Sequence, residues 1–207
     1  GTLELRPLVA AFDARGEAVT EVVRARDEIY ADGWTPSEIQ GVAREPWTFT
    51  LDLGEAPGRP VRLVIDGAIL PTAASLNIAR AQRGAARLST PVTVRLPLYP
   101  PRLEAETADG WIELMPAMPF PAGKTKTMIV DTPPLPEGVS RLRMVGTQWL
   151  SWDRIAWSVA AADEAPVIRA KLAPRVADLR FRGFSKLIRQ APNAPHAYDY
   201  ARVTTDS

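Results

Sequence analysis

Apolar and polar residues alternate along several short stretches of the chain. The clearest is Trp47–Leu53, where four large apolar residues alternate with threonine and aspartate. Such a period of two is typical of a β-strand that buries one face. Thr2–Phe12 alternates less strictly, and Val61–Leu70 is mostly apolar with a bulge or bend expected at Asp66-Gly67. Further strands are predicted at Val92–Tyr99, Gly110–Leu114, Thr127–Asp131, Ser140–Gln148 and Trp152–Val159.

Helical patterns are few. Val19–Tyr30 fits a strand or a helix, Ala73–Gly84 is the best helix candidate, and Leu179–Arg189 fits a short helix or an extended arm. The 20 prolines disfavour long helices, because proline lacks the backbone N–H and clashes with the preceding turn. The sequence therefore predicts an all-β protein, an antiparallel β-sandwich with one or two short helices.

The charges are unevenly distributed. Residues 1–60 carry 6 basic and 11 acidic side chains, residues 61–166 carry 11 and 10, and residues 167–207 carry 8 and 3. We expect an N-terminal strand extension at residues 1–30, the sandwich at 31–165, and a basic arm at 166–207. The arm is predicted to pack on the sandwich or on a further domain, with Arg180 and Arg182 at the interface. Binding of a polyanion is the alternative, although nucleic-acid-binding domains usually have a clear overall positive charge.

The composition excludes several kinds of chemistry. Without cysteine there are no disulfides, thiolate metal sites or cysteine nucleophiles, and the single histidine excludes a multi-histidine metal site. No apolar run approaches the ~18 residues of a membrane span, and no signal-peptide pattern opens the sequence. Because the sequence starts and stops abruptly, we expect a piece of a longer protein. No cofactor, bound metal, nucleic acid or membrane contact is predicted.

Two motifs suggest catalysis and are better explained structurally. Gly123-Lys124-Thr125 resembles the end of a phosphate-binding loop, but Met118 stands where the first glycine is needed. The sole histidine, His196, lies in a proline-rich tail and is interpreted as a loop residue, although a triad is recognised by geometry rather than sequence.

Paired carboxylates could hydrolyse a glycosidic bond without histidine or cysteine. The sequence does not select a pair, and a structural role is the preferred interpretation of each acid. The same acids with Asn77 could ligate calcium, which prefers oxygen ligands, but the sequence lacks an Asp-x-Asp-x-Asp-Gly spacing. The candidate acids are Asp66, Glu113, Asp131 and Asp153.

Tryptophans beside turns are the best candidates for ligand contact. An Ala-Asp-Gly-Trp sequence occurs at residues 31–34 and again at 108–111. An exposed indole offers an apolar face and an N–H donor to a sugar or peptide. The alternative is that these two indoles pack on the core, as we expect of the other four tryptophans. The predicted ligand-binding residues are Asp32, Trp34, Asp109 and Trp111.

Several segments together resemble a known family. They include Asp32-Gly33-Trp34, residues 119–128 (Pro-Phe-Pro-Ala-Gly-Lys-Thr-Lys-Thr-Met), Trp152-Asp153-Arg154-Ile155 and Arg182-Gly183-Phe184-Ser185. In this order they resemble the C-terminal β module of bacterial multidomain proteins with FG-GAP and ASPIC/UnbV segments or tetratricopeptide repeats. The resemblance implies a galactose-binding-like jelly roll, joined to repeat domains and located outside the cytoplasm. It departs at Gly146-Thr147-Gln148, where the family pattern has Thr-Asn.

The sequence thus favours a non-catalytic binding or interaction module of a larger bacterial protein, contacting a carbohydrate, a protein or its adjacent domains. A purely structural domain that docks on its own repeat or propeller domain is the second hypothesis. A carbohydrate-active hydrolase with paired carboxylates is the third.

Overall fold

The computed structural model describes residues 4–70, 78, 99–123, 125–159, 171–188 and 197–205. The chain divides into two compact units, one formed by Leu3–Ala160 and one that contains Ala161–Ser207.

The first unit contains a four-stranded antiparallel sheet. Strand β9 lies between β1 and β4, and β7 forms the far edge beside β4. The edge strand β1 is very short and pairs with β9 through Arg6 opposite Trp157. The strands, in spatial order, are β1 (Arg6–Pro7), β9 (Leu150–Val159), β4 (Val61–Ile69) and β7 (Lys126–Asp131).

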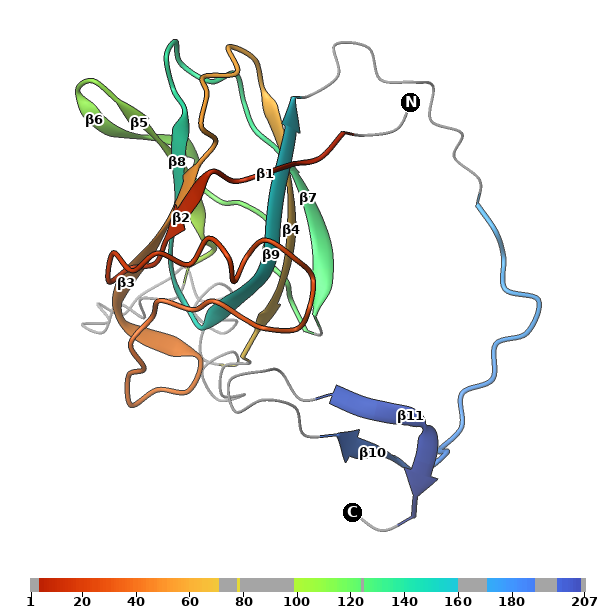
Figure 1. Cartoon of the computed structure of the whole chain (residues 1–207). Helices are drawn as coiled ribbons and strands as arrows, with labels where there is room; N and C mark the ends of the chain where they lie inside the picture. Colours follow the sequence, from red (N-terminus) through yellow and green to blue (C-terminus); the bar gives the residue numbers. More distant parts are fainter. Residues whose placement is uncertain are drawn as a thin grey trace, which may run out of the picture. The chain divides into compact units, whose positions relative to one another are not determined.

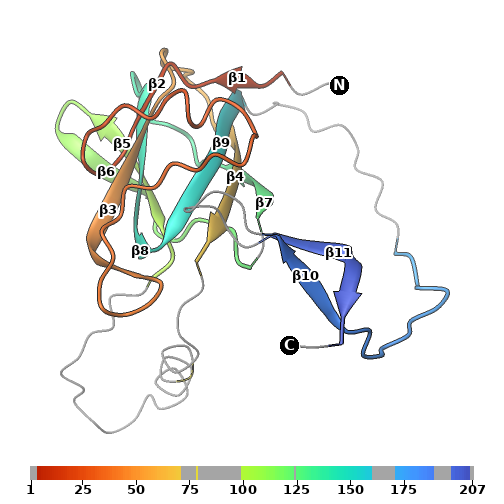
Figure 2. The same ribbon diagram turned by 60° about the horizontal axis from the view of Figure 1, so that its bottom comes forward.

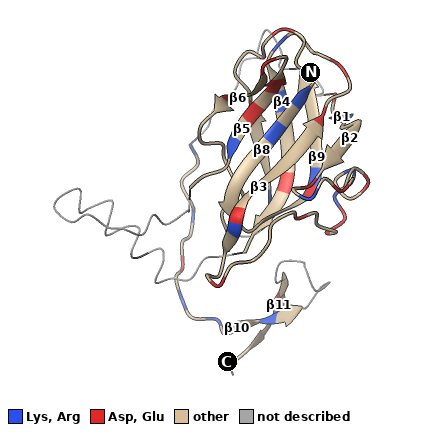
Figure 3. Cartoon of the chain, turned by 90° about the vertical axis from the view of Figure 1, so that its left-hand side faces the viewer, with Lys and Arg blue, Asp and Glu red and all other residues tan. Residues whose placement is uncertain are grey.

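A five-stranded antiparallel sheet forms the opposite layer (Figures 1 and 2). Strand β8 lies at its centre, between β3 and β5. Basic and acidic positions lie side by side on the neighbouring strands β8 and β5 (Figure 3). In spatial order the strands are β2 (Ala10–Phe12), β3 (Val42–Asp52), β8 (Arg141–Gln148), β5 (Arg102–Thr107) and β6 (Gly110–Met115).

The hydrophobic core comprises side chains from both sheets. The alternating apolar residues of Trp47–Leu53 are all buried, as their period of two predicts. The indole of Trp47 meets that of Trp152 edge to face, with 6.3 Å between ring centroids. Together the two antiparallel sheets and the shared core confirm the predicted all-β sandwich.

Several predicted strands match observed ones. Strands β3, β4, β6, β7, β8 and β9 lie where the alternation or apolar runs indicated. The predicted irregularity at Asp66-Gly67 is a register shift between β4 and β9, typical of a β-bulge. Val92–Tyr99 and Ala73–Gly84 fall almost entirely outside the described residues.

Two local predictions were wrong or incomplete. Val19–Tyr30 forms neither a strand nor a helix, but a series of turns beside β9. Its backbone forms hydrogen bonds with residues far along the chain; Ile155, for example, donates its N–H to the carbonyl of Val23. Strand β5 was not predicted, because its only buried apolar residues are Leu103 and Ala105, and the buried position between them is occupied by the charged residue Glu104.

The second unit contains a two-stranded antiparallel sheet, β10 (Phe184–Ile188) and β11 (Ala197–Thr204). The described part of Leu179–Arg189 is therefore extended and not helical. The pairing shifts between Ser185 and Lys186, whose partners are Val203 and Asp199. A two-stranded hairpin alone is marginally stable in water.

The N-terminal residues belong to the sandwich. Strand β1 lies in the four-stranded sheet and β2 in the five-stranded sheet, so residues 6–12 run from one layer to the other. Val9 lies between β1 and β2 in the sequence and donates its N–H to the carbonyl of Asp52 on β3. This crossing closes one side of the core.

Candidate functional site

Trp34 lies on the loop between β2 and β3 and packs against the core. Its ring stacks on Trp149 with 4.9 Å between centroids and 3° between planes, and its Nε1 donates to the carbonyl of Leu150 at 2.8 Å. Asp32 is half-buried near Arg15 and Asp13; burial raises the pKa of its carboxyl group, and Arg15 partly opposes that rise. One face of the Trp34 indole is thus already covered by protein.

Trp111 lies on the edge strand β6, next to the exposed turn residue Asp109. The guanidinium of Arg143, on β8, lies over the Trp111 ring at 4.3 Å from its centroid. Such a cation–π contact covers an indole face with a charged group. Trp111 is therefore half-buried and held by the sheet.

The structure does not bring the two predicted tryptophans together. Trp111 lies at the Arg143 end of β8, whereas Trp34 stacks on Trp149, just beyond the opposite end. Trp149 follows Arg143 by six positions, which corresponds to roughly 20 Å along an extended strand. A single small ligand does not span both positions.

Two of the four candidate acids, Asp66 and Asp153, do lie close to one another. Asp66 pairs with Arg154 across β4 and β9, so Asp153 stands next to it at the bulge. Both residues are fully buried. Repulsion from Asp66 also contributes to the raised pKa of Asp153, as expected of two carboxylates that share one region.

The Asp153 carboxylate holds the loop before Tyr30. Its Oδ1 accepts the backbone N–H groups of Asp27 and Glu28 at 3.0 and 3.1 Å, and Oδ2 is buried without a hydrogen-bond partner. Glu28 has a φ of 68°, in the left-handed region that a residue with a side chain rarely adopts. Burial raises the pKa of Asp153, and the two N–H groups oppose that rise.

The Asp66 carboxylate is bound by neighbouring cations and a hydroxyl. Its Oδ2 accepts Nε of Arg154 at 2.7 Å, and Nε of Arg26 lies 3.8 Å from Oδ1. The hydroxyl of Thr127 also donates to Oδ1. With these partners, Asp66 joins β4, β7, β9 and the 26–30 loop in one polar cluster.

The other two candidate acids are apart from this pair. Asp131 makes a two-point ion pair with Arg62, and Glu113 is exposed on β6, on the opposite sheet. Asn77 and His196 lie outside the described residues. Within the described part of the chain, no group of three or more histidine, aspartate or glutamate side chains is arranged to hold a metal ion.

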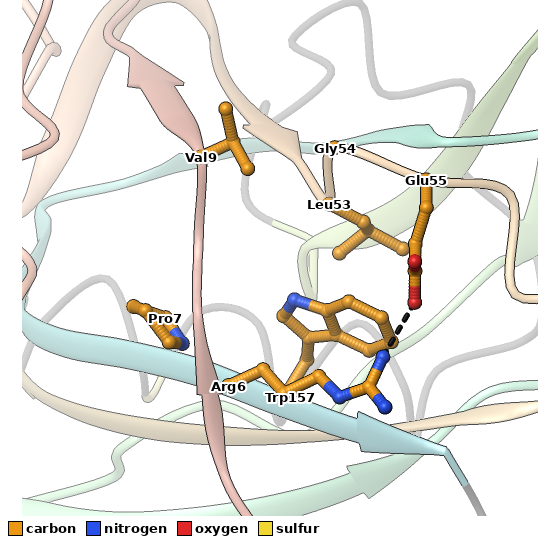
Figure 4. A pocket seen from close by; sticks show the side chains of 7 residues that line it. All are labelled: Arg6, Pro7, Val9, Leu53, Gly54, Glu55 and Trp157. Carbon is orange, nitrogen blue, oxygen red and sulfur yellow. Dashed lines mark hydrogen bonds and ion pairs between the residues drawn. The ribbon is translucent and has the colours of Figure 1, made fainter.

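An open pocket of about 310 Å³ lies at the side of the sandwich where β1 crosses to β2 (Figure 4). Its base is Trp157, which is almost fully buried and whose Nε1 has no hydrogen-bond partner. At the mouth, Arg6 and Glu55 form an ion pair with 2.5 Å between Nη1 and Oε1, and Arg6 also lies 5.2 Å from the Trp157 ring centroid. The remaining lining residues are Pro7, Val9, Leu53 and Gly54.

No local sequence pattern indicated this pocket. Its residues come from three separate segments, and Trp157 was interpreted as a packing residue, which its burial confirms. Gly54 has a φ of 80°, and a Cβ added there would lie too close to the side chain of Val9. Only the pairing of β1 with β9 brings Arg6 over Trp157.

The predicted interface residues lie in the second unit. Arg180 is highly exposed, with Asp178 3.4 Å away. Arg182 donates to the carbonyl of Tyr200 at 2.8 Å and to Oγ of Ser185 at 2.9 Å. Around them, large apolar side chains are also exposed: Leu172, Val176, Leu179, Phe181, Phe184, Leu187 and Ile188.

Among the described residues, no helix is long and apolar enough to cross a membrane. A scan against models of protein families found no match, and neither did searches of curated proteins and of solved structures.

Proposed function

We propose that the chain is a non-catalytic interaction module of a larger multidomain protein, and that its basic C-terminal segment is the docking element. The described residues of this arm (166–207) are 171–188 and 197–205. The observation that carries the proposal is that the arm exposes large apolar side chains next to cations. Leu179 is fully exposed and Phe181 is 74% exposed. Large apolar side chains exposed together on one segment commonly mark a protein–protein contact.

The charges of the arm define the partner. Its described residues include six cations and two acids, a net charge of +4. The apolar residues require a surface that excludes water, while the cations favour acidic groups at its rim. We therefore infer an acidic protein surface with an apolar centre as the partner.

The geometry of the carboxylates supports a non-catalytic role over a glycoside hydrolase. Asp131 and Asp66 are paired with arginines, and the one partnered oxygen of Asp153 binds two backbone N–H groups. A general acid and its partner carboxylate must instead face the substrate. These acids act as structural ties between strands and loops.

The resemblance to the C-terminal module of FG-GAP and ASPIC/UnbV or tetratricopeptide-repeat proteins supports the same proposal. Such a module would be galactose-binding-like, with a jelly-roll arrangement of its strands, and would adjoin repeat domains in a bacterial protein outside the cytoplasm. In that setting the acidic partner surface belongs to an adjacent domain of the parent chain.

A titration in trans tests the proposal. The full 207-residue chain is labelled and titrated with the remaining domains of its parent protein, and compared with Leu179→Ser/Arg180→Glu. Neither side chain contributes to the pairing of β10 with β11, so we expect the variant to retain the hairpin. Arg24→Glu, at an exposed ion pair with Glu21, is the charge-matched control.

The expected result is saturable binding that the double variant weakens at least tenfold, with the control unchanged. Reversal of Arg182 to Glu should weaken binding further, since it also removes the contacts with Tyr200 and Ser185. No binding by the full chain, or equal binding by all variants, would contradict the proposal.

A ligand-binding role for the two predicted tryptophans is the second candidate. Trp111 is half-exposed on an edge strand, with a polar surround that suits a carbohydrate. A glycan array with Trp34→Ala and Trp111→Ala tests it, and binding that neither change affects would exclude these positions.

A further inference from the structure

The pocket at Trp157 has the features of a small-molecule site, and all of its lining residues belong to the Leu3–Ala160 unit. Its volume of about 310 Å³ is near the lower end of the range for ligand pockets. Apolar groups form most of the lining, and one cation and one anion lie at the mouth. This combination of an apolar wall with a few polar groups is typical of ligand sites.

The ion pair at the mouth can be opened at low cost. The side chains of Arg6 and Glu55 are 46% and 60% exposed. An exposed pair of this kind contributes little to stability, because water screens both charges. A ligand that offers a better partner to each group can therefore take the place of the pair.

The charges specify what such a ligand must carry. A singly charged ligand would satisfy one group and leave the other without its present partner. A zwitterion places a carboxylate on Arg6 and an ammonium group on Glu55, so that two ion pairs replace one. Arginine is well suited to the carboxylate, because its planar guanidinium donates two parallel N–H groups.

The walls specify the body of the ligand. The side chains of Pro7, Val9 and Leu53 offer no hydrogen bonds to a polyhydroxyl compound, so hydroxyl groups placed against them would lack partners. An apolar side chain instead gains from leaving water. The Nε1–H of Trp157 is buried without a hydrogen-bond partner, at the end of the indole nearer the β1 strand (Figure 4).

We propose that this pocket binds an apolar α-amino acid as a zwitterion. The carboxylate lies on Arg6, the ammonium group on Glu55, and the aliphatic side chain against Pro7, Val9 and Leu53. Trp157 forms the base. The site lies entirely within residues 6–157 and does not depend on the arm.

The indole N–H resonance of Trp157 reports on the pocket directly. The full chain is labelled with nitrogen-15, and the resonance is assigned by its loss in Trp157→Phe. L-leucine is the probe, and it should shift this resonance saturably. Three compounds each lack one feature of leucine: N-acetyl-L-leucine the ammonium group, L-leucinamide the carboxylate, and glycine the apolar side chain. Each should bind at least about tenfold more weakly, as loss of a charged contact or an apolar group predicts.

Variants at the mouth complete the test. Arg6→Gln and Glu55→Gln should each weaken leucine binding about tenfold or more, because each removes one charged contact. Arg24→Gln, at the exposed ion pair with Glu21, is the matched control and should bind like the parent. The proposal is overturned if leucine leaves the Trp157 resonance unchanged, if D-glucose binds as well as leucine, or if the two mouth variants bind normally.

Discussion

Replacements of Asp153 separate the effect of its hydrogen-bond acceptor from the effect of its negative charge, because its two carboxylate oxygens have different environments. Oδ1 accepts two backbone N–H groups, whereas Oδ2 is buried with no partner. Asp153→Asn retains an acceptor for the N–H groups of Asp27 and Glu28 and removes the negative charge. Asp153→Ala removes the acceptor as well.

The expected magnitudes follow from these contacts. A hydrogen bond to a charged group contributes about 1.5–3 kcal/mol. Asp27 and Glu28 are exposed, so water replaces part of each lost bond. We expect Asp153→Ala to lower the free energy of unfolding by about 2–3 kcal/mol. Asp153→Asn should remain within about 1 kcal/mol of the parent, because relief of the buried charge offsets the weaker hydrogen bonds.

The pH dependence has a definite sign. Burial raises the pKa of Asp153, so the folded state favours the protonated carboxyl group more strongly than the unfolded state does. Its contribution to stability is fully present below the unfolded pKa and is lost as pH rises through the raised folded pKa. The free energy of unfolding of Asp153→Asn, relative to that of the parent, should therefore be highest at neutral pH and should fall towards acid pH.

Urea unfolding followed by tryptophan fluorescence, at neutral and acid pH, measures all three proteins. A loss in Asp153→Asn as large as that in Asp153→Ala would refute the reasoning. It would mean that the charge itself, and not the acceptor, holds the 26–30 loop. A pH-independent difference between Asp153→Asn and the parent would refute the assignment of the raised pKa.

The remaining predictions concern packing and ion pairs in the sandwich. Gly146→Ala should lower the free energy of unfolding by about 1–3 kcal/mol in urea titrations, because the added Cβ would meet the Trp47 indole at 2.5 Å; an unchanged midpoint would contradict this packing. The hydrogen bond from Arg62 lowers the pKa of Asp131, so the pair contributes stability above the unfolded pKa that is lost as pH falls. In Asp131→Asn, the stability lost between neutral and acid pH should be smaller than in the parent, by less than about 1 kcal/mol, since the carboxylate is half-exposed. If thermal melts show the same loss at acid pH in both proteins, the pair contributes nothing. Glu104 is buried between Arg102 and Arg143; burial alone would raise its pKa, but the hydrogen bonds from both arginines lower it. Glu104→Leu should retain the fold at neutral pH and show a weaker loss of stability in acid, whereas full unfolding would indicate that the two arginines cannot be accommodated without the carboxylate.

The sequence predicted strands best where burial alone determines the pattern. Trp47–Leu53 alternates because one face meets the core, and β3 forms there. Strand β5 was not predicted because its glutamates form ion pairs with arginines of β8, about 40 residues away in the sequence. A local pattern does not reveal partners so distant.

The site residues show the same limit. Asp66 and Asp153 were both among the candidate acids, but only the pairing of β4 with β9 places them side by side. The turns of Val19–Tyr30 likewise depend on Asp153 and Ile155, far along the chain. Placement in space, rather than residue type, identified the buried pair and the pocket at Trp157.

Hydrogen–deuterium exchange of the arm amides tests the proposed interaction role most directly. The exchange is measured in the 207-residue chain alone and in the complete parent protein. A two-stranded hairpin with uncovered apolar side chains should exchange rapidly by itself, because its hydrogen bonds open easily. We predict strong protection of residues 179–188 and 197–204 in the parent protein. Equally rapid exchange in both would contradict a docking role for the arm.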